Sequence, residues 1–183
     1  SLSRGRPRLG GMSRTFAVTV LGHDRPGIIA EVTGALADLG GNLEDSSMTL
    51  LRGHFAWTLV VAVEATSVEV QSRLAHLTDE GLVVSVLPVP DAEDAAVTGA
   101  RWLLSVHGAD RPGIVSGLTG VVAAAGGNIT DLTTRLGTGL YLLVAEVALP
   151  AGTDADALAV RIGEAAAALG VRATLQPADA DEL

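Results

Sequence analysis

An internal repeat constrains this chain more than any other feature of its sequence. The heptapeptide at residues 22–28 (GHDRPGI) recurs at residues 108–114 (GADRPGI). The hexapeptide at residues 40–45 (GGNLED) recurs at residues 126–131 (GGNITD), at the same offset of 86 residues. Because the offset is the same, no insertion separates the two motifs in either copy. The 183 residues therefore contain two copies of one module in tandem.

The first half of each copy has the pattern of a strand followed by a helix. In the first copy, residues 16–20 alternate between apolar and small or polar side chains, which predicts a half-buried strand. Apolar residues at helical spacing then predict a helix over about residues 28–39, with Pro26 suited to its first position. Gly40 is expected to end this helix, because glycine adopts the left-handed cap conformation at little cost.

The second half of each copy has the pattern strand, strand, helix, strand. In the first copy the two strands meet at a hairpin turn at residues 52–53, a helix follows over residues 68–77, and the last strand covers residues 82–87. Large apolar side chains alternate with small ones along residues 55–63, so they share one face of the sheet. The order β-α-β-β-α-β predicts an α+β fold, two ferredoxin-like sandwiches in tandem.

The expected sandwich leaves one face of each sheet without cover. The two predicted sandwiches also divide the chain into segments. A small module gains by covering that face, so we expect a homodimer or a tightly packed pair of modules within the chain. Residues 1–14, rich in Arg, Gly and Ser, predict a disordered lead-in. The first module is expected over residues 15–88, a linker rich in Asp, Ala and Pro over 89–100, the second module over 101–176 and a tail over 177–183.

The net charge and the lack of cysteine indicate which partners and which cellular compartment to expect. The net charge is −9, and all 12 basic residues are arginine. Four arginines lie in the first 14 residues, which leaves eight against 21 acidic residues in the rest. A chain this acidic would be repelled by the phosphate backbone of a nucleic acid. We therefore expect no direct contact with nucleic acid. The absence of Cys and of a long apolar run predicts a cytoplasmic protein that does not enter a membrane.

The turn between the first strand and the first helix is the main candidate for a binding site. Its backbone N–H groups lie at the positive end of the helix dipole, which suits a carboxylate or a phosphate. Glycine lets a ligand approach closely, an aspartate can accept a hydrogen bond from an amino group, and an asparagine offers both donor and acceptor. The candidate ligand contacts are Asp24, Arg25, Gly27 and Asn42, with Asp110, Arg111, Gly113 and Asn128 in the second copy.

Each of these residue types also has a structural interpretation. The two aspartates can cap the helices that follow them. The two arginines can be solvated, and the two glycines can serve helix–strand packing alone. The two asparagines can be turn residues with a positive φ.

The order strand, Asp-Arg-Pro-Gly-Ile, helix, Gly-Gly-Asn resembles the ACT domain, a regulatory module that binds amino acids and related small molecules. The resemblance covers residues 16–87 and 102–175. It implies a ligand at an interface between modules, near the first turn and the start of the second strand. It also adds Ile28 and Ile114 to the candidate ligand contacts.

Residues 42–55 carry a closer likeness. The stretch NLEDSSM followed by LLRGHF, on a tandem of two modules, resembles the glycine cleavage system transcriptional repressor group. That resemblance implies a glycine- or serine-like ligand and a protein partner such as a transcriptional activator, because members of the group have no DNA-binding motif. In the second copy Thr130 replaces Glu44 and residues 132–134 differ, so that site is expected to be weaker or specialised differently.

Nothing in the sequence indicates catalysis. A similar module begins the formyltetrahydrofolate deformylases, but the sequence has no counterpart of their hydrolase domain. The four histidines do not recur between the copies and lack the spacing of metal ligands. We therefore expect a regulatory protein that is not an enzyme and uses no cofactor or metal. The alternative is a structural protein–protein adaptor that binds no small molecule.

Overall fold

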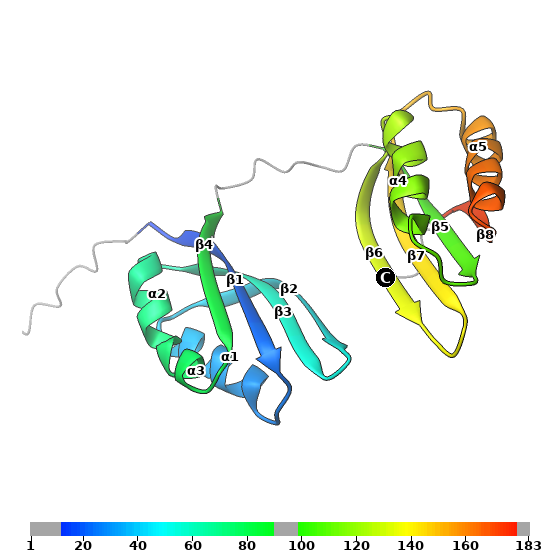
Figure 1. Ribbon diagram of the computed structural model, residues 1–183. Helices are drawn as coiled ribbons and strands as arrows, with labels where there is room; N and C mark the ends of the chain where they lie inside the picture. Colours follow the sequence, from blue (N-terminus) through cyan, green and yellow to red (C-terminus); the bar gives the residue numbers. More distant parts are fainter. Residues whose placement is uncertain (1–11, 90–98, 179–183) are drawn as a thin grey trace, which may run out of the picture. The chain divides into compact units, whose positions relative to one another are not determined.

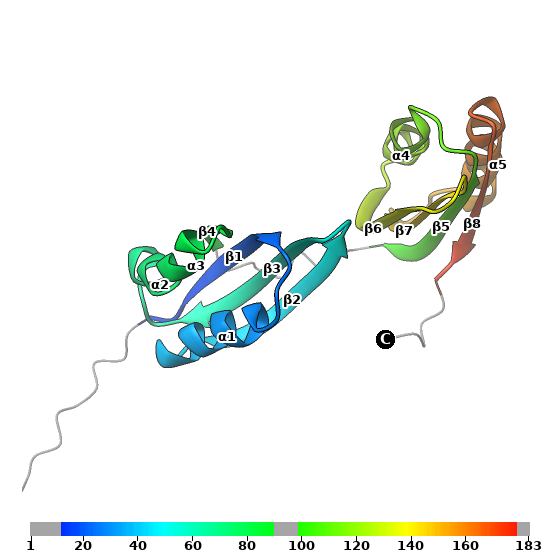
Figure 2. The same cartoon turned by 60° about the horizontal axis from the view of Figure 1, so that its bottom comes forward.

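Each half of the chain forms a four-stranded antiparallel sheet with its helices packed against one face (Figures 1 and 2). The computed structural model describes residues 12–89 and 99–178, which divide into two units. We call them module 1 (residues 12–89) and module 2 (residues 99–178). This architecture confirms the predicted α+β fold of two ferredoxin-like sandwiches.

Module 1 has the strand order β2-β3-β1-β4. Its elements are β1 (Arg14–His23), α1 (Ile28–Asp38), β2 (Asn42–Leu51), β3 (His54–Val63), α2 (Ser67–Arg73), α3 (Ala75–Asp79) and β4 (Val83–Val89).

Module 2 has the equivalent order β6-β7-β5-β8. Figure 2 shows α4 and α5 on the same side of its sheet. Its elements are β5 (Ala100–Gly108), α4 (Ile114–Ala124), β6 (Asn128–Leu136), β7 (Tyr141–Leu149), α5 (Ala155–Ala168) and β8 (Val171–Pro177).

The core of module 1 lies between the sheet and the helices, as the alternation predicts. The five large residues of β3 that were expected to share one face are each at most 3% exposed. They pack with one face of β1 and with the apolar stripe of α1 in a single cluster. The hairpin between β2 and β3 is also as predicted, since Arg52 (φ 50°) and Gly53 (φ 81°) have the left-handed conformation of a tight hairpin turn.

The ends of the first helix agree only in part with expectation. Gly40 (φ 73°) ends α1 as predicted, and the Gly41 N–H donates to the Leu36 carbonyl oxygen at 2.9 Å. Pro26, however, does not occupy the first helical position. The helix begins two residues later, at Ile28, because Gly27 takes the N-cap position in a left-handed conformation.

The predicted helix over residues 68–77 is two short helices in module 1. α2 ends at Arg73 and α3 begins at Ala75, and Leu74 between them is fully buried. In module 2 a single helix of 14 residues, α5, takes their place. Among the described residues, no helix is long and apolar enough to cross a membrane.

Both sheets have an irregular edge strand. In module 1 the pairing of β2 with β3 shifts register between Leu43 and Asp45, so Glu44 bulges out of the ladder. The pairing of β6 with β7 shifts at the equivalent place, between Ile129 and Asp131.

Some predicted segments extend beyond the described residues. β1 begins at Arg14, within the predicted lead-in, and residues 1–11 of that segment lie outside the described residues. β4 ends at Val89 and β5 begins at Ala100, while residues 90–98 of the predicted linker lie outside them as well. The same holds for residues 179–183 of the predicted tail.

Candidate ligand-binding site

An open pocket of about 420 Å³ lies at the turn between β1 and α1 in module 1. Four of the five predicted ligand contacts of this module line it, whereas Asn42 does not. Further lining comes from the first turn of α1 and from β2 and β3, so the walls are mostly apolar. The lining residues are Asp24, Arg25, Gly27, Ile28, Ile29, Ala30, Met48 and Phe55.

The N-terminus of α1 opens on this pocket without a side-chain cap. Gly27 is the N-cap residue, and no side chain accepts a hydrogen bond from the first turn. Gly113 has the same role and the same lack of a side-chain cap at α4. The interpretation of Asp24 and Asp110 as helix caps is therefore wrong. The turn is too long for such capping, since a cap side chain must belong to the N-cap residue itself.

The second helix of each module is capped in the usual way. The Thr66 hydroxyl accepts a hydrogen bond from the Glu69 N–H at α2. The Asp154 carboxylate accepts one from the Ala157 N–H at α5, at 3.0 Å. The first helices thus differ from the second ones within the same modules, because the N–H groups of their first turns are left for another acceptor.

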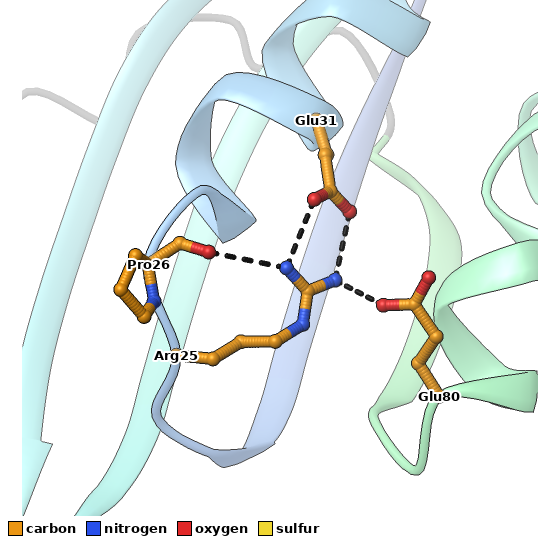
Figure 3. Close-up of polar contacts among 4 residues, drawn as sticks. All are labelled: Arg25, Pro26, Glu31 and Glu80. Carbon is orange, nitrogen blue, oxygen red and sulfur yellow. Dashed lines mark hydrogen bonds and ion pairs between the residues drawn. The ribbon is translucent and has the colours of Figure 1, made fainter.

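Arg25 ties the turn to two other elements of module 1 (Figure 3). Its guanidinium donates to both carboxylate oxygens of Glu31, at 2.9 and 2.8 Å, and also forms an ion pair with Glu80 before β4. It further donates to the Pro26 carbonyl oxygen at 3.2 Å. The hydrogen bond from Arg25 lowers the pKa of Glu31, and the same bond raises the pKa of Arg25. Arg25 is therefore not simply solvated, as one interpretation held, but held in a bidentate ion pair.

Arg111 in module 2 lacks these partners. Gly117 stands where module 1 has Glu31, and Leu169, before Gly170 and β8, stands where module 1 has Glu80. Among the residues that the structure describes, no carboxylate pairs with Arg111. Its guanidinium instead lies beside Gly170, so close that a Cβ there would be 3.0 Å from Arg111 Cζ.

The two asparagines lie at the first positions of β2 and β6, and neither has a positive φ. The interpretation as positive-φ turn residues is therefore wrong, since a strand begins there. Asn128 lines a separate pocket of about 430 Å³ between α4 and β6, which does not include Asp110, Arg111, Gly113 or Ile114. That pocket is lined by Ser116, Thr119, Gly120, Val122, Ala123, Gly127, Asn128 and Ile129.

Several residues at the site of module 1 are not predicted from the sequence. Glu31 is an acidic residue in the first turn of α1, a position that could have suggested a partner for Arg25. Glu80 is 55 residues away from Arg25, and only the fold brings the two together. Met48 faces the pocket because it pairs with Trp57, which belongs to the core face of β3.

The histidines gather in one place only among the described residues. The rings of His23 and His54 lie 5.1 Å apart at the paired ends of β1 and β3. Their counterparts in module 2 are Ala109 and Leu140. Within residues 12–89 and 99–178, no group of three or more metal-ligating side chains is found.

Known proteins resemble this chain over one or both modules. A UPF0237 protein of Methanopyrus kandleri is 38% identical over 77 residues, which is 42% of this chain and 86% of that protein. The glycine cleavage system transcriptional repressor of Escherichia coli is 26% identical over 121 residues, 66% of this chain and 64% of that protein. The crystal structure of an unknown protein from Galdieria sulphuraria is 28% identical, with a TM-score of 0.76 over 91% of this chain and 99% of that chain.

The ACT domain family matches the sequence twice. The matches cover residues 14–86 and 101–175, which correspond to the two modules of the structure. The chain is therefore a tandem ACT-domain protein, homologous to the glycine cleavage system transcriptional repressor and to UPF0237 proteins, and it belongs to the ACT domain family.

Proposed function

We propose that the pocket of module 1 binds a small amino-acid-type ligand and that its occupancy changes how the chain acts on a protein partner. The pocket carries this proposal. Its volume of about 420 Å³ falls within the range of roughly 300–1,000 Å³ that is usual for small-molecule sites. It also lies at a helix N-terminus that no side chain caps.

The lining suggests how each part of an amino acid would be held. The uncapped N–H groups after Gly27 would receive the carboxylate. The Asp24 carboxylate, which has no side-chain hydrogen bond to the described residues, would accept from the amino group. The Asp24 main chain is already fixed, because its N–H donates to the Gly53 carbonyl oxygen at 3.2 Å. Ile28 and Met48 would contact the ligand's side chain.

Arg25 would act on this ligand indirectly. Its guanidinium is engaged by Glu31 and Glu80, so it is a positioning residue for the turn and not a free cation. In module 2 the roles of Asp110, Arg111, Gly113 and Ile114 stay proposals of the same kind. The pocket around Asn128 is lined partly by hydroxyl groups, which suits a ligand or a role different from that of module 1.

The proposed output is regulatory. The relation to the repressor of Escherichia coli supports a role in transcriptional control, by way of a partner such as a transcriptional activator, in glycine or one-carbon metabolism. The acidic body supports contact with a protein and not with nucleic acid. We infer that the chain works in the cytoplasm and that it is not an enzyme.

A structural adaptor without a ligand is the second candidate. It is favoured by the large exposed side chains of β2, where Met48, Leu50 and Leu51 are each about half exposed. In that case the pocket would be part of a protein-binding surface.

Thermal unfolding with and without ligand separates the two candidates. A ligand at a hundred times its dissociation constant should stabilise the protein by about 2.7 kcal/mol. The panel would contain glycine, serine and larger apolar amino acids, with a dicarboxylic acid without an amino group as control. The proposal requires a selective shift in the wild type that Asp24→Ala abolishes and Asp110→Ala retains. A flat panel at millimolar concentrations would favour the adaptor.

A further inference from the structure

The sheet face of module 1 that is turned away from the helices carries no charged side chain on β1, β3 and β4 over its three central rows, and on the edge strand β2 only Asp45 lies in these rows. On β1, β3 and β4 these rows hold only aliphatic and hydroxyl side chains. Val83 and Leu87 are 64% and 62% exposed there, and Leu21 is 42% exposed. We call this surface the neutral face; it consists of Ala17, Thr19, Leu21, Ala56, Thr58, Val60, Val83, Ser85 and Leu87.

The middle row of the neutral face is a line of hydroxyl groups that crosses the whole sheet. The strand register places Ser47 of β2 beside Thr58 of β3, Thr58 beside Thr19 of β1, and Thr19 beside Ser85 of β4. A hydroxyl group both donates and accepts. Such a row can therefore pair with an identical row, which a surface of donors alone or acceptors alone cannot do.

The corresponding face of module 2 is built differently. On β5, β7 and β8 the row through His107 also contains Arg172, and the row through Leu103 contains Glu146. The edge strand β6 adds Arg135, where module 1 has Thr49, and Asp131, where module 1 has Asp45. Part of this charge is satisfied inside the module. Glu146 accepts from the Thr130 hydroxyl at 2.9 Å and forms an ion pair with Arg101 at 3.5 Å. Covering this face would desolvate several charges, whereas the neutral face itself carries none and borders on one, Asp45 of β2.

We propose that the neutral face is the contact surface of a homodimer, in which module 1 of one chain packs face to face on module 1 of a second copy. A two-fold dimer requires a surface that is complementary to itself. The neutral face meets this requirement through its self-pairing hydroxyl row and its apolar flanks. The chain has a net charge of −9, so two copies repel each other least where the surface carries no charge.

The size of the surface predicts a weak contact. Three strands at about 4.8 Å spacing and five residues at about 3.4 Å each cover roughly 250 Å² in projection, and side-chain relief raises the accessible area above that. Two copies would then bury on the order of 500 Å² in projection, and more once side-chain relief is counted, which is the size of a weak contact. The dimer should accordingly be concentration-dependent and not permanent.

Sedimentation of the full chain over a concentration series tests the dimer. The decisive variant is Thr19→Arg at the centre of the neutral face, and its matched control is Ser105→Arg at the equivalent position of module 2. Because Thr19 is partly buried, Ser85→Arg on the edge strand β4, where Ser85 is exposed, serves as a second variant. Circular dichroism before each run establishes that the variants are folded.

The wild type and Ser105→Arg should both approach twice the monomer mass, while Thr19→Arg and Ser85→Arg lose at least about tenfold in dimer affinity. Added salt should leave the wild-type dimer intact or strengthen it, since no ion pair holds it. A wild type that stays monomeric at every concentration overturns the proposal. So does a dimer that persists in both folded neutral-face variants, because another surface such as the β2 edge then holds it.

Discussion

The two modules share one fold and one repeated turn, yet the arginine of that turn has a different environment in each. Arg25 is bound by Glu31 and Glu80, whereas Arg111 lies beside Gly170 without a carboxylate partner among the described residues. The difference arises at two positions outside the repeated heptapeptide. In the first helix Glu31 is replaced by Gly117, and shortly before the last strand Glu80 is replaced by Leu169. The shared motif therefore gives both modules the same turn backbone, but the ion pairs of the arginine in that turn depend on residues elsewhere in each module.

The largest expected effect on stability comes from substitutions in the cores of the two modules, and it tests whether the modules are independent. Ile28 and Ile114 are equivalent and at most 2% exposed, and each belongs to the core of its own module. Ile28→Ala and Ile114→Ala should each cost about 2–5 kcal/mol of unfolding free energy. Hydrogen exchange should show the loss of protection only in the module that carries the substitution. Equal loss in both modules would mean that they unfold as one unit.

A smaller effect is expected at the N-cap glycines. A Cβ added at Gly27 (φ 94°) or Gly113 (φ 93°) would have open space around it, with no neighbouring atom closer than 3.4 Å. Alanine would therefore be opposed only by the left-handed backbone, at about 1–2 kcal/mol in both modules. Gly120→Ala is the control, because this helical glycine has nothing within 4 Å, and it should be neutral or slightly stabilising. Chemical denaturation measures all three, and unequal losses at the N-caps would show that the turns are not equivalent.

A modest effect separates the two arginines. Arg25→Ala should lower the thermal stability of module 1, while Arg111→Ala should leave that of module 2 unchanged. The loss should depend on pH through Glu31, whose folded-state pKa Arg25 holds below the usual 4.5. A lowered carboxyl pKa adds stability above the unfolded-state value, and this stability disappears as the pH falls through the folded-state value. The difference between wild type and Arg25→Ala should therefore be full at neutral pH and shrink below about pH 4.5. A difference that does not change with pH would remove Glu31 from the explanation.

The smallest effect comes from rebuilding the ion pairs in module 2. Gly117→Glu together with Leu169→Glu would give Arg111 two carboxylate partners at the positions equivalent to Glu31 and Glu80. Leu169 also packs against the core of module 2, so replacing it loses apolar packing. This loss offsets the small gain from the new ion pairs, and the net free energy of unfolding should change little. A double-mutant cycle with Arg111→Ala isolates the new interaction, which should be weakly favourable and vanish at high salt. A coupling of zero at low salt would mean that the geometry of module 2 does not admit the ion pair.

The sequence predicts the fold well because its signals are local or repeated. Alternation in β3 identifies the core face, and the same motifs at one offset identify two modules. The break at Leu74 was not predicted, because apolar spacing continues through it. The Arg25–Glu80 ion pair was not predictable either, since it depends on how α3 and β4 are placed. At the pocket, the turn residues follow from the motif, whereas the absence of Asn42 from the lining depends on tertiary placement.

The register shift in each edge strand bears on how such a protein avoids strand-by-strand association. An exposed edge strand offers unpaired backbone groups to any other strand, and a flat one can recruit copy after copy. The bulge at Glu44 interrupts the edge of module 1 near its start and places an exposed acidic side chain there, and module 2 has the equivalent interruption at Thr130. Strand-by-strand growth into fibres is thereby discouraged at both edges. The proposed contact through the neutral face, in contrast, is satisfied by a single partner.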